Sequence, residues 1–384
     1  MFHVFLLLIV CTALAYIYGS GTVEVKVIEN GKAVTVQKKS LLACIAFVAL
    51  ALTLILFAGL RSEGNDTLTY AEGFQKVSPS ISGLDWSLGN NPLFFVYQAM
   101  LKRFISSSPK VFFLITACFI ELSYLLFIKK YSVNFGLSIY ILISFTLYAF
   151  TMAALKQSMA IAIAIWSVPF ILDKKYFRAL LLIGIATLFH AFSFLFLVAF
   201  IMWKSIWDKR AALIIVGTII AGIFFSNFVG QALDFTNSIG GNVYTNEDFS
   251  TGTSIFRIIV YLIPSIMSFV YRKKLRDVNS PFLNISVNLS LVAACFMVLA
   301  GIGGANLTGR LAGYFDIFIC FLIPAILKYG IVEKQTRDIA TIVVFVAYAI
   351  FYYSYYNRFA VLYNHDFFVD FYHHTSLSAV FASW

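Results

Sequence analysis

The sequence has 384 residues, of which 61% are hydrophobic and only 12% are charged. A water-exposed surface usually needs about twice that share of charged residues, so the composition excludes a soluble protein of two or three domains. The 41 Phe and 21 Tyr residues also exclude a disordered chain. The formal net charge of +10 would suit a nucleic-acid-binding protein, and the positions of the cations decide whether it does.

Apolar segments long enough to cross about 30 Å of hydrocarbon recur along the whole chain. We expect membrane-spanning helices near 2–19, 40–60, 110–128, 133–153, 157–172, 210–232, 256–271, 283–303, 311–328 and 338–356. These segments do not alternate as the strands of a membrane β-barrel do, so helices must satisfy the backbone. The sequence therefore predicts an all-α, polytopic integral membrane helical bundle in a single domain, 1–384, with about 10–12 transmembrane helices.

The first apolar segment, 2–19, could be a cleaved signal peptide or a retained helix. Small residues around Ala15 resemble a cleavage site, but no cation precedes the segment and the positive charge follows it. We therefore expect a retained helix. The next residues, 20–39, alternate between apolar and polar side chains on both sides of Asn30-Gly31. This pattern predicts a small hairpin with a type I′ turn.

Lys and Arg gather in the loops on one side of the predicted bundle. Six segments there hold 19 cations and 7 acids, a net charge of +12, at 20–39, 129–130, 173–178, 204–210, 271–277 and 328–338. Nine cations and nine acids lie on or near the other side. The basic side is predicted to be cytoplasmic, which places both termini and two loops, 61–109 and 233–255, outside. The charge of +10 thus reflects membrane topology, and we expect no nucleic acid as a partner.

Two shorter segments do not fit simple spans. Residues Pro92 to Phe104 are Phe-rich but short and end with two cations, so we expect an interfacial helix inside the outer loop 61–109. The stretch 179–203 has cations of the cytoplasmic type on both sides, yet its 25 residues cannot cross twice at about 1.5 Å per residue. Either the charge bias fails here, or the segment is re-entrant and turns near His190, which would require a protein-lined or wet cavity there.

Polar residues of the outer side carry the functional signal. Just beyond the second span come Arg61, Asp66 and Tyr70. A guanidinium can grip a phosphate with two hydrogen bonds, and a nearby carboxylate can deprotonate a sugar hydroxyl. The structural alternative is an ordinary interfacial anchor followed by a solvated loop.

More cations and one histidine follow on the same side. Lys156 and Gln157 lie at the outer end of a predicted helix hairpin, and Arg257 and Arg310 each begin a span. Lys156 could instead extend to the membrane surface, and His190 could be a hydrogen-bonded helix contact. Packing could also have scattered these residues. If they meet, they form an anion site at the mouth of the bundle, where a lipid-linked pyrophosphate is the natural ligand. Glu121 and Asp316 lie within spans, where we expect hydrogen bonds between helices.

Three blocks of residues occur in a defined order. They are Arg61-x4-Asp66-Thr67-x2-Tyr70-x3-Phe74; then Lys156-Gln157-x2-Ala160 with Ile185-Ala186-x2-Phe189-His190-x2-Ser193; and finally Arg310-x3-Tyr314-Phe315. In this order they resemble the EpsG/Wzy family of bacterial polysaccharide polymerases, which make O-antigen, capsule or exopolysaccharide. One position departs from the family pattern, because this chain has Lys156 where the family usually has Arg. The charge is kept, but the two-pronged geometry is lost.

The resemblance implies a membrane glycosyltransferase of the bacterial cytoplasmic (inner) membrane. Such an enzyme joins undecaprenyl-pyrophosphate-linked oligosaccharide repeat units at the outer face, with membrane lipid around it and a chain-length regulator protein as a further partner. Under this hypothesis the catalytic candidates are Asp66 and His190, either of which could be the base. The substrate-binding candidates are Arg61, Tyr70, Lys156, Gln157, Arg257, Arg310 and Tyr314. No cofactor is implied, and the sequence shows no metal-binding cluster.

Three other functions stay open. A membrane acyltransferase would be expected to place a His and an Asp together, and His190 has no Asp nearby in the sequence. A ligase that transfers the glycan to a different acceptor would need the same outer cations and histidine. A non-enzymatic flippase or exporter would need a cation-lined path through the whole membrane, whereas the polar residues here gather on one side.

Overall fold

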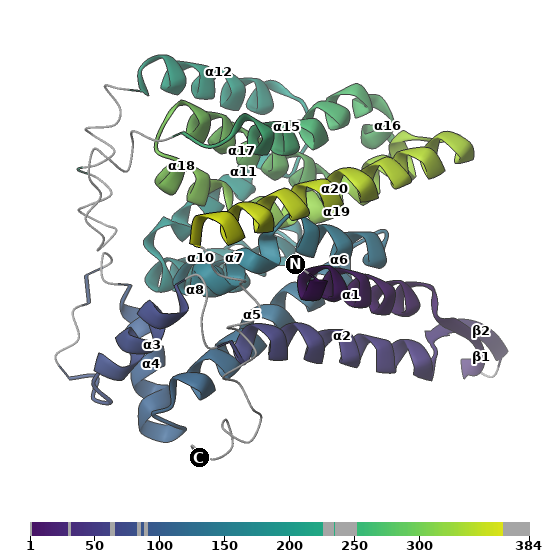
Figure 1. Ribbon diagram of the computed structural model, residues 1–384. Coiled ribbons are helices and arrows are strands. Elements are labelled where there is room, and N and C mark those ends of the chain that lie inside the picture. Colours follow the sequence, from purple (N-terminus) through teal and green to yellow (C-terminus); the bar gives the residue numbers. More distant parts are fainter. Residues whose placement is uncertain are drawn as a thin grey trace.

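The computed structural model describes residues 2–29, 32–61, 66–82, 86–87, 91–225, 234 and 252–363. Its helices lie roughly alongside one another in a bundle, and a two-stranded hairpin projects from one end (Figure 1). This confirms the all-α, multi-pass membrane fold. The described part of the chain contains five helical segments that are long and apolar enough to span a membrane, or six with one bent pair. The long spans are therefore fewer than the predicted 10–12, because several expected spans are short or broken helices.

The long spans coincide with expected apolar segments. They are α2 (Leu41–Gly59), α5 (Pro109–Tyr131), α8 with α9 (Leu155–Ala164 and Ser167–Leu172), α17 (Pro281–Ile302) and most of α20 (Lys334–Tyr363). The bent pair is α6 (Phe135–Ser144) and α7 (Leu147–Ala153), which meet at an angle of 51°. Thr146, which lies at this break, has a φ of 66°, a strained value for a β-branched residue.

The first elements are α1 (Phe2–Ser20), β1 (Thr22–Glu29) and β2 (Lys32–Lys39). The strands pair antiparallel from Thr22↔Lys39 to Glu29↔Lys32, so the predicted hairpin is confirmed. Its proposed turn, Asn30-Gly31, lies outside the described residues. The Lys39 ammonium donates to the carbonyls of Tyr18 and Gly19 at 2.6 and 2.8 Å, which satisfies the C-terminal end of α1.

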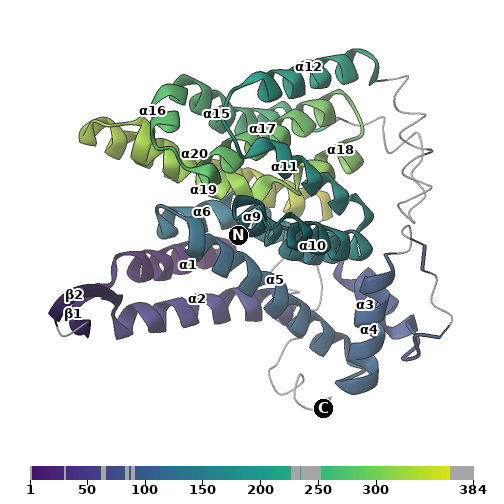
Figure 2. The same cartoon turned by 180° about the vertical axis from the view of Figure 1, so that it is seen from behind.

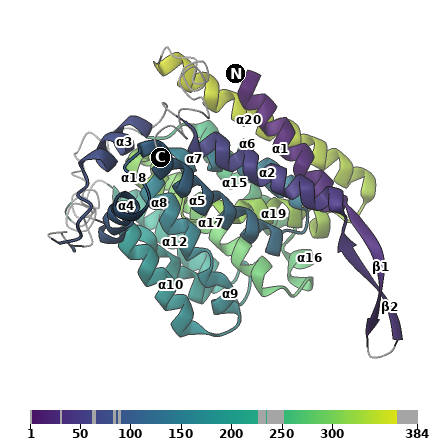
Figure 3. The ribbon, with the colours of Figure 1, turned by 90° about the horizontal axis from the view of Figure 1, so that it is seen from below.

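Two short helices close the opposite end of the bundle. These are α3 (Thr67–Lys76) and α4 (Pro92–Phe104), and they run crosswise to α2 and α5 (Figure 2). Lys102 of α4 donates to the carbonyls of Gln75 and Val77 at 2.7 and 2.8 Å, which ties the two helices together. Seen from below, α3 and α4 lie at one end of the bundle and the hairpin lies at the other (Figure 3). We call the end that holds α3 and α4 the site end.

The stretch 179–203 turns back on itself at the expected residue. Helix α10 (Tyr176–Phe189) stops at His190, whose backbone is extended at φ −154° and ψ 117°. A 3₁₀ helix, η2 (Ala191–Val198), and α11 (Ala199–Met202) follow. Because η2 packs against α10 and α11 packs against α9, the chain returns toward the end from which it entered. This geometry agrees with the re-entrant alternative.

Side chains of α17 hold the end of this returning segment. Asn288 donates to the carbonyls of Met202 and Ser205 at 2.7 and 2.8 Å. One turn earlier, Asn284 donates to the carbonyls of Trp203 and Lys204 at 3.2 and 3.1 Å. These carbonyls lie at the end of a helix and lack partners within it, so the two amides satisfy backbone that the segment cannot satisfy alone.

The remaining helices complete the bundle. They are α12 (Lys209–Ile223), α15 (Ile255–Val270), α16 (Arg272–Asp277), α18 (Ala305–Ala312), η3 (Asp316–Phe318), α19 (Ile319–Ala325) and the π-helix η4 (Ile326–Gly330). The expected span 311–328 is thus divided among several pieces, with Pro324 inside α19. Most of the expected outer loop 233–255 lies outside the described residues.

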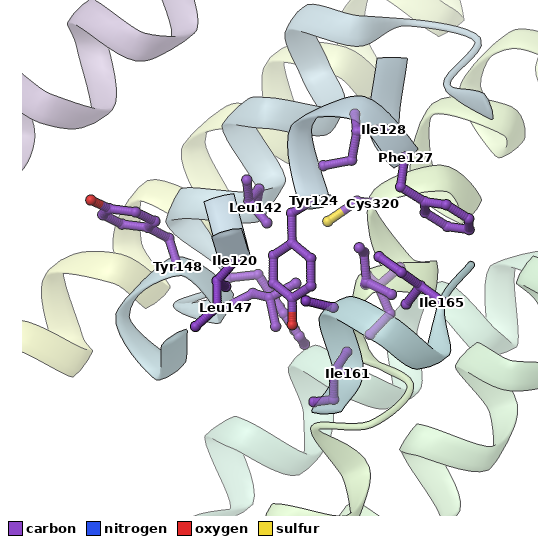
Figure 4. Packing of buried hydrophobic residues seen from close by; sticks show 14 of the residues in the cluster. Ile120, Tyr124, Phe127, Ile128, Leu142, Leu147, Tyr148, Ile161, Ile165 and Cys320 are labelled. Atoms are coloured by element: carbon purple, nitrogen blue, oxygen red, sulfur yellow. The ribbon is translucent and has the colours of Figure 1, made fainter. Parts of the chain in front are cut away.

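The core forms where α5, α6, α8 and α19 meet. Figure 4 shows Tyr124 of α5 among Ile120, Leu142 and Ile161, and its side chain is fully buried. Glu121, also on α5, accepts a hydrogen bond of 2.7 Å from the Thr151 hydroxyl of α7. This is the contact between helices that the sequence predicts for a carboxylate inside a span.

Candidate functional site

A cavity of about 170 Å³ opens at the site end of the bundle. Three charged side chains of the predicted site line it, namely Asp66, Arg257 and Arg310. They come from segments that are far apart in the sequence, at the starts of α3 and α15 and at the end of α18. The remaining lining residues are Thr146, Phe150, Ala153, Ala154, Ala305, Gly309 and Tyr355. The fold therefore brings one carboxylate and two guanidinium groups to a single cavity.

Asp66 presents a carboxylate that its own helix does not use. It occupies the N-cap position of α3, where an aspartate often accepts a hydrogen bond from the backbone, but its side chain makes no such bond. Its backbone carbonyl accepts from the Tyr70 N–H at 2.9 Å. The helix start thus fixes the position of Asp66, while the exposed carboxylate is left to face the cavity.

Hydrogen bonds to backbone atoms fix the positions of the two arginines that line the cavity. Arg310 is exposed in the last turn of α18, and its carbonyl accepts a 2.7 Å hydrogen bond from the buried Gln157 amide. Arg257 lies in the first turn of α15, where the Ser254 hydroxyl caps the helix by accepting from the Arg257 N–H at 3.3 Å. Gln157 therefore fixes the backbone of Arg310 without lining the cavity itself.

A buried polar relay continues inward from Arg257. The Tyr261 hydroxyl accepts a hydrogen bond from Arg257 and donates one of 2.7 Å to the carboxylate of Asp316. Both Tyr261 and Asp316 are buried. The relay confirms that Asp316 makes a hydrogen bond between helices, but the sequence reading did not single out Tyr261. The four-residue spacing of Arg257 and Tyr261, which puts both on one face of a helix, is the signal that could have found it.

His190 and Tyr314 meet at the break after α10. The Tyr314 hydroxyl and His190 Nδ1 are hydrogen-bonded to each other, and the two ring centroids are 6.0 Å apart. Lys156 and Arg310 are both close enough to influence the charge of His190. The pair therefore lies beside the charged cavity, although neither residue lines it.

Lys156 and Tyr70 connect the start of α8 to α3, which begins just after Asp66. The Tyr70 hydroxyl accepts a hydrogen bond from the Lys156 backbone N–H. Burial, and secondly the charge of Asp66, raise the pKa of the Tyr70 phenol to about 12, so it stays protonated at neutral pH. The Lys156 ammonium lies over the rings of Phe94 and Phe95, 5.6 and 5.3 Å from their centroids.

Arg61 lies away from the cavity surface. Its side chain is only 3% exposed, and its guanidinium donates to Thr67 Oγ1 at 2.9 Å, to the Met152 carbonyl at 3.1 Å and to the Ala58 carbonyl. It also lies 4.5 Å from the centroid of the Phe113 ring. Burial lowers the pKa of Arg61 to about 10, so the group remains charged. Arg61 thus joins the ends of α2, α3 and α7, and protein atoms take up its donors.

The sequence was compared with known protein families, curated proteins and solved structures. It matches the EpsG family over residues 44–368. No curated protein and no solved structure matches it. The matched region includes the cavity, His190 and Lys156, and it is well over half of the chain. The chain belongs to the EpsG family.

Proposed function

We propose that this EpsG-family chain is a membrane glycosyltransferase that polymerises oligosaccharide repeat units carried on undecaprenyl pyrophosphate. Family membership supports the polymerase role. The observation that carries the proposed chemistry is the cavity in which Asp66 faces Arg257 and Arg310. The reaction would take place at the outer face of the bacterial cytoplasmic membrane, with the site end outward, and a chain-length regulator would be a further partner.

In the proposed reaction, a hydroxyl of the nonreducing sugar of a new lipid-linked unit attacks the anomeric carbon of the growing glycan. The new C–O bond forms as the bond to the pyrophosphate breaks, and undecaprenyl pyrophosphate leaves. The hydroxyl proton passes to Asp66, the carboxylate that lines the cavity. Arg257 and Arg310 stabilise the charge that develops on the leaving pyrophosphate.

The other candidate residues take supporting roles in this proposal. Gln157 fixes the backbone of Arg310, and Tyr314 orients His190. Lys156 contributes positive charge next to the cavity, and Tyr70 orients the start of α8. Because its donors are used by protein atoms, Arg61 acts as a positioning residue for the start of α3.

The proposal is tested by the length of glycan chains in a complemented deletion strain. Arg310→Ala, Arg257→Ala and Asp66→Asn, expressed at normal levels, are each expected to reduce polymerisation by roughly 10²–10³-fold. Single repeat units should then replace the ladder of longer chains. Arg103→Ala is the matched control, because Arg103 lies at the same end of the bundle but stacks on Phe104 outside the cavity.

Each alternative predicts a different result. A ligase would leave the polymer intact on its lipid carrier while the final acceptor stays bare. A flippase or exporter would leave unpolymerised lipid-linked units on the cytoplasmic side. Either result, or an unchanged ladder in the Arg310→Ala strain, would overturn the proposal.

A further inference from the structure

An apolar groove of about 600 Å³ runs along the side of the bundle between α5, α8 and α10, with Trp166 at the junction of α8 and α9. We call it the α8 groove. It lies within the membrane-spanning part of these helices. Most of its walls are aliphatic or aromatic, and the residues that matter below are Ile115, Phe119, Ser123, Ile163, Trp166 and Leu182.

The few polar groups in the α8 groove bond to one another. The Trp166 indole N–H donates to Ser123 Oγ at 2.9 Å, and the Ser123 hydroxyl donates to the Ala162 carbonyl at 2.6 Å. Such groups offer little to a polar ligand, since using them would break existing bonds. The groove therefore presents a hydrocarbon-like surface, and it suits a ligand without polar atoms at this depth.

A cation, Lys156, lies near the start of α8, at the site end of the α8 groove. Lys156 is seven residues before Ile163, so both lie on one face of the helix, separated by about 10 Å along its axis. No carboxylate pairs with Lys156 in the part of the chain that the structure describes. The groove and Lys156 together fit an amphipathic ligand with an anionic head and a long hydrocarbon tail.

A second apolar groove has no Lys or Arg at the site end of its own helices. It has a volume of about 280 Å³ and lies between η2, α12 and α17. Helix α17 contains no Lys or Arg at all, and the cations of α12 are its first two residues, Lys209 and Arg210. These two cations lie at the opposite end of the bundle from the site (Figure 1). Hydrocarbon surface alone thus does not distinguish the α8 groove from ordinary lipid-facing surface, whereas Lys156 does.

We propose that the α8 groove binds the isoprenoid chain of the lipid-pyrophosphate carrier, with the phosphate nearest the chain held at Lys156. This inference rests on the proposed function and assigns a place to one part of its substrate. Ala154, two residues before Lys156, lines the charged cavity, so a headgroup at Lys156 lies next to that cavity. The chain then runs down α8 past Ile163 to Trp166, which keeps it in the membrane while the glycan reaches Asp66.

The test compares donors that carry the same glycan on chains of different length. Purified protein in vesicles of neutral phospholipid is given a repeat unit on undecaprenyl pyrophosphate or on dimethylallyl pyrophosphate. Ile163→Trp fills the groove and is expected to raise KM for the undecaprenyl donor about tenfold, a loss of about 1.4 kcal/mol. The KM for the dimethylallyl donor, whose five-carbon chain ends before Ile163, should change less than twofold.

Matched variants separate groove filling from general damage. Ile214→Trp places the same bulk in the second groove and should leave both KM values unchanged. Leu182→Trp narrows the α8 groove from a half-buried position on α10, and it serves as the filling variant if Ile163→Trp does not fold. Lys156→Gln should raise KM for both donors equally, because both carry the same headgroup.

The outcomes distinguish this inference from the proposed function. If wild-type protein makes polymer but the filling variants change KM equally for both donors, or not at all, the groove assignment is wrong while the function stands. An equal effect of Ile214→Trp and Ile163→Trp would also overturn it. If wild-type protein elongates neither donor, the proposed function itself fails.

Discussion

Arg61 shows how the same residue type can serve two purposes in one protein. The guanidinium of Arg61 is buried and makes hydrogen bonds to three protein oxygens, whereas Arg310 is exposed and lines the cavity. Because two of those bonds reach carbonyls at the ends of α2 and α7 and the third reaches Thr67, Arg61 fixes the start of α3 against these two helices. The exposed side chain of Arg310 can instead contact a ligand in the cavity.

This difference predicts opposite responses to the same substitution. Arg61→Lys should lower the free energy of unfolding by about 2 kcal/mol, because a lysine cannot satisfy three separated acceptors and some are left buried without a donor. Arg310→Lys should leave thermal stability within about 0.5 kcal/mol of wild type while reducing turnover. Thermal unfolding in detergent and the glycan ladder measure the two effects. A stable but inactive Arg61→Lys protein would instead favour direct substrate contact by Arg61.

At the scale of elements, the returning segment α10–η2–α11 depends on hydrogen bonds from another helix, α17, to satisfy its backbone. Its helix is interrupted at His190, and its last carbonyls are bonded by Asn284 and Asn288 of α17. Non-helical backbone at membrane depth persists only where protein or water satisfies it. The position of His190 at the site thus depends on side chains from a distant helix.

Removing one of these amides should loosen the segment. Asn288→Ala deletes two hydrogen bonds to backbone carbonyls and should cost about 1–3 kcal/mol. A cysteine introduced at the buried Met202, in purified protein without the native cysteines, should then react faster with a water-soluble maleimide. The matched control is Ser290→Ala, since the buried Ser290 hydroxyl has no hydrogen-bond partner among the described residues. Equal labelling rates in both variants would contradict the role assigned to Asn288.

At the scale of the whole molecule, two buried tyrosines contribute oppositely to stability. The Tyr148 hydroxyl donates to the Leu54 carbonyl of α2 at 2.6 Å. The Tyr124 hydroxyl, at the centre of the core (Figure 4), has no hydrogen-bond partner among the described residues. A buried hydroxyl without a partner costs about 1–3 kcal/mol.

Tyr124→Phe is therefore expected to leave stability unchanged or raise it by about 1 kcal/mol, and Tyr148→Phe to lower it by a similar amount. Both substitutions remove one oxygen and keep the ring, so each is the control for the other. The shift of the unfolding midpoint in detergent provides the measurement. A clear loss of stability in Tyr124→Phe would show that its hydroxyl has a bonded partner.

The sequence predicted the features that depend on local composition. Apolar segments located the helices, alternation located the hairpin, and cations on both sides of 179–203 indicated its return. The candidate residues Asp66, Arg257 and Arg310 do line one cavity. The partners of Arg61 could not be predicted, because Met152 is 91 residues away and the contact depends on how α2 packs against α7. The break at Thr146 has no sequence signal, since neither Gly nor Pro marks it.

The bonds from α17 to the returning segment also set an order of events during synthesis. Asn284 and Asn288 are made 80 to 86 residues after the carbonyls to which they donate. At ~5–20 residues per second, the ribosome adds that length in several seconds, during which the segment can form neither pair of bonds. A nascent chain arrested just before α17 should therefore be cut by protease near Lys204, and a chain arrested after α17 should be protected. The last stage of folding at His190 would then await a helix made much later.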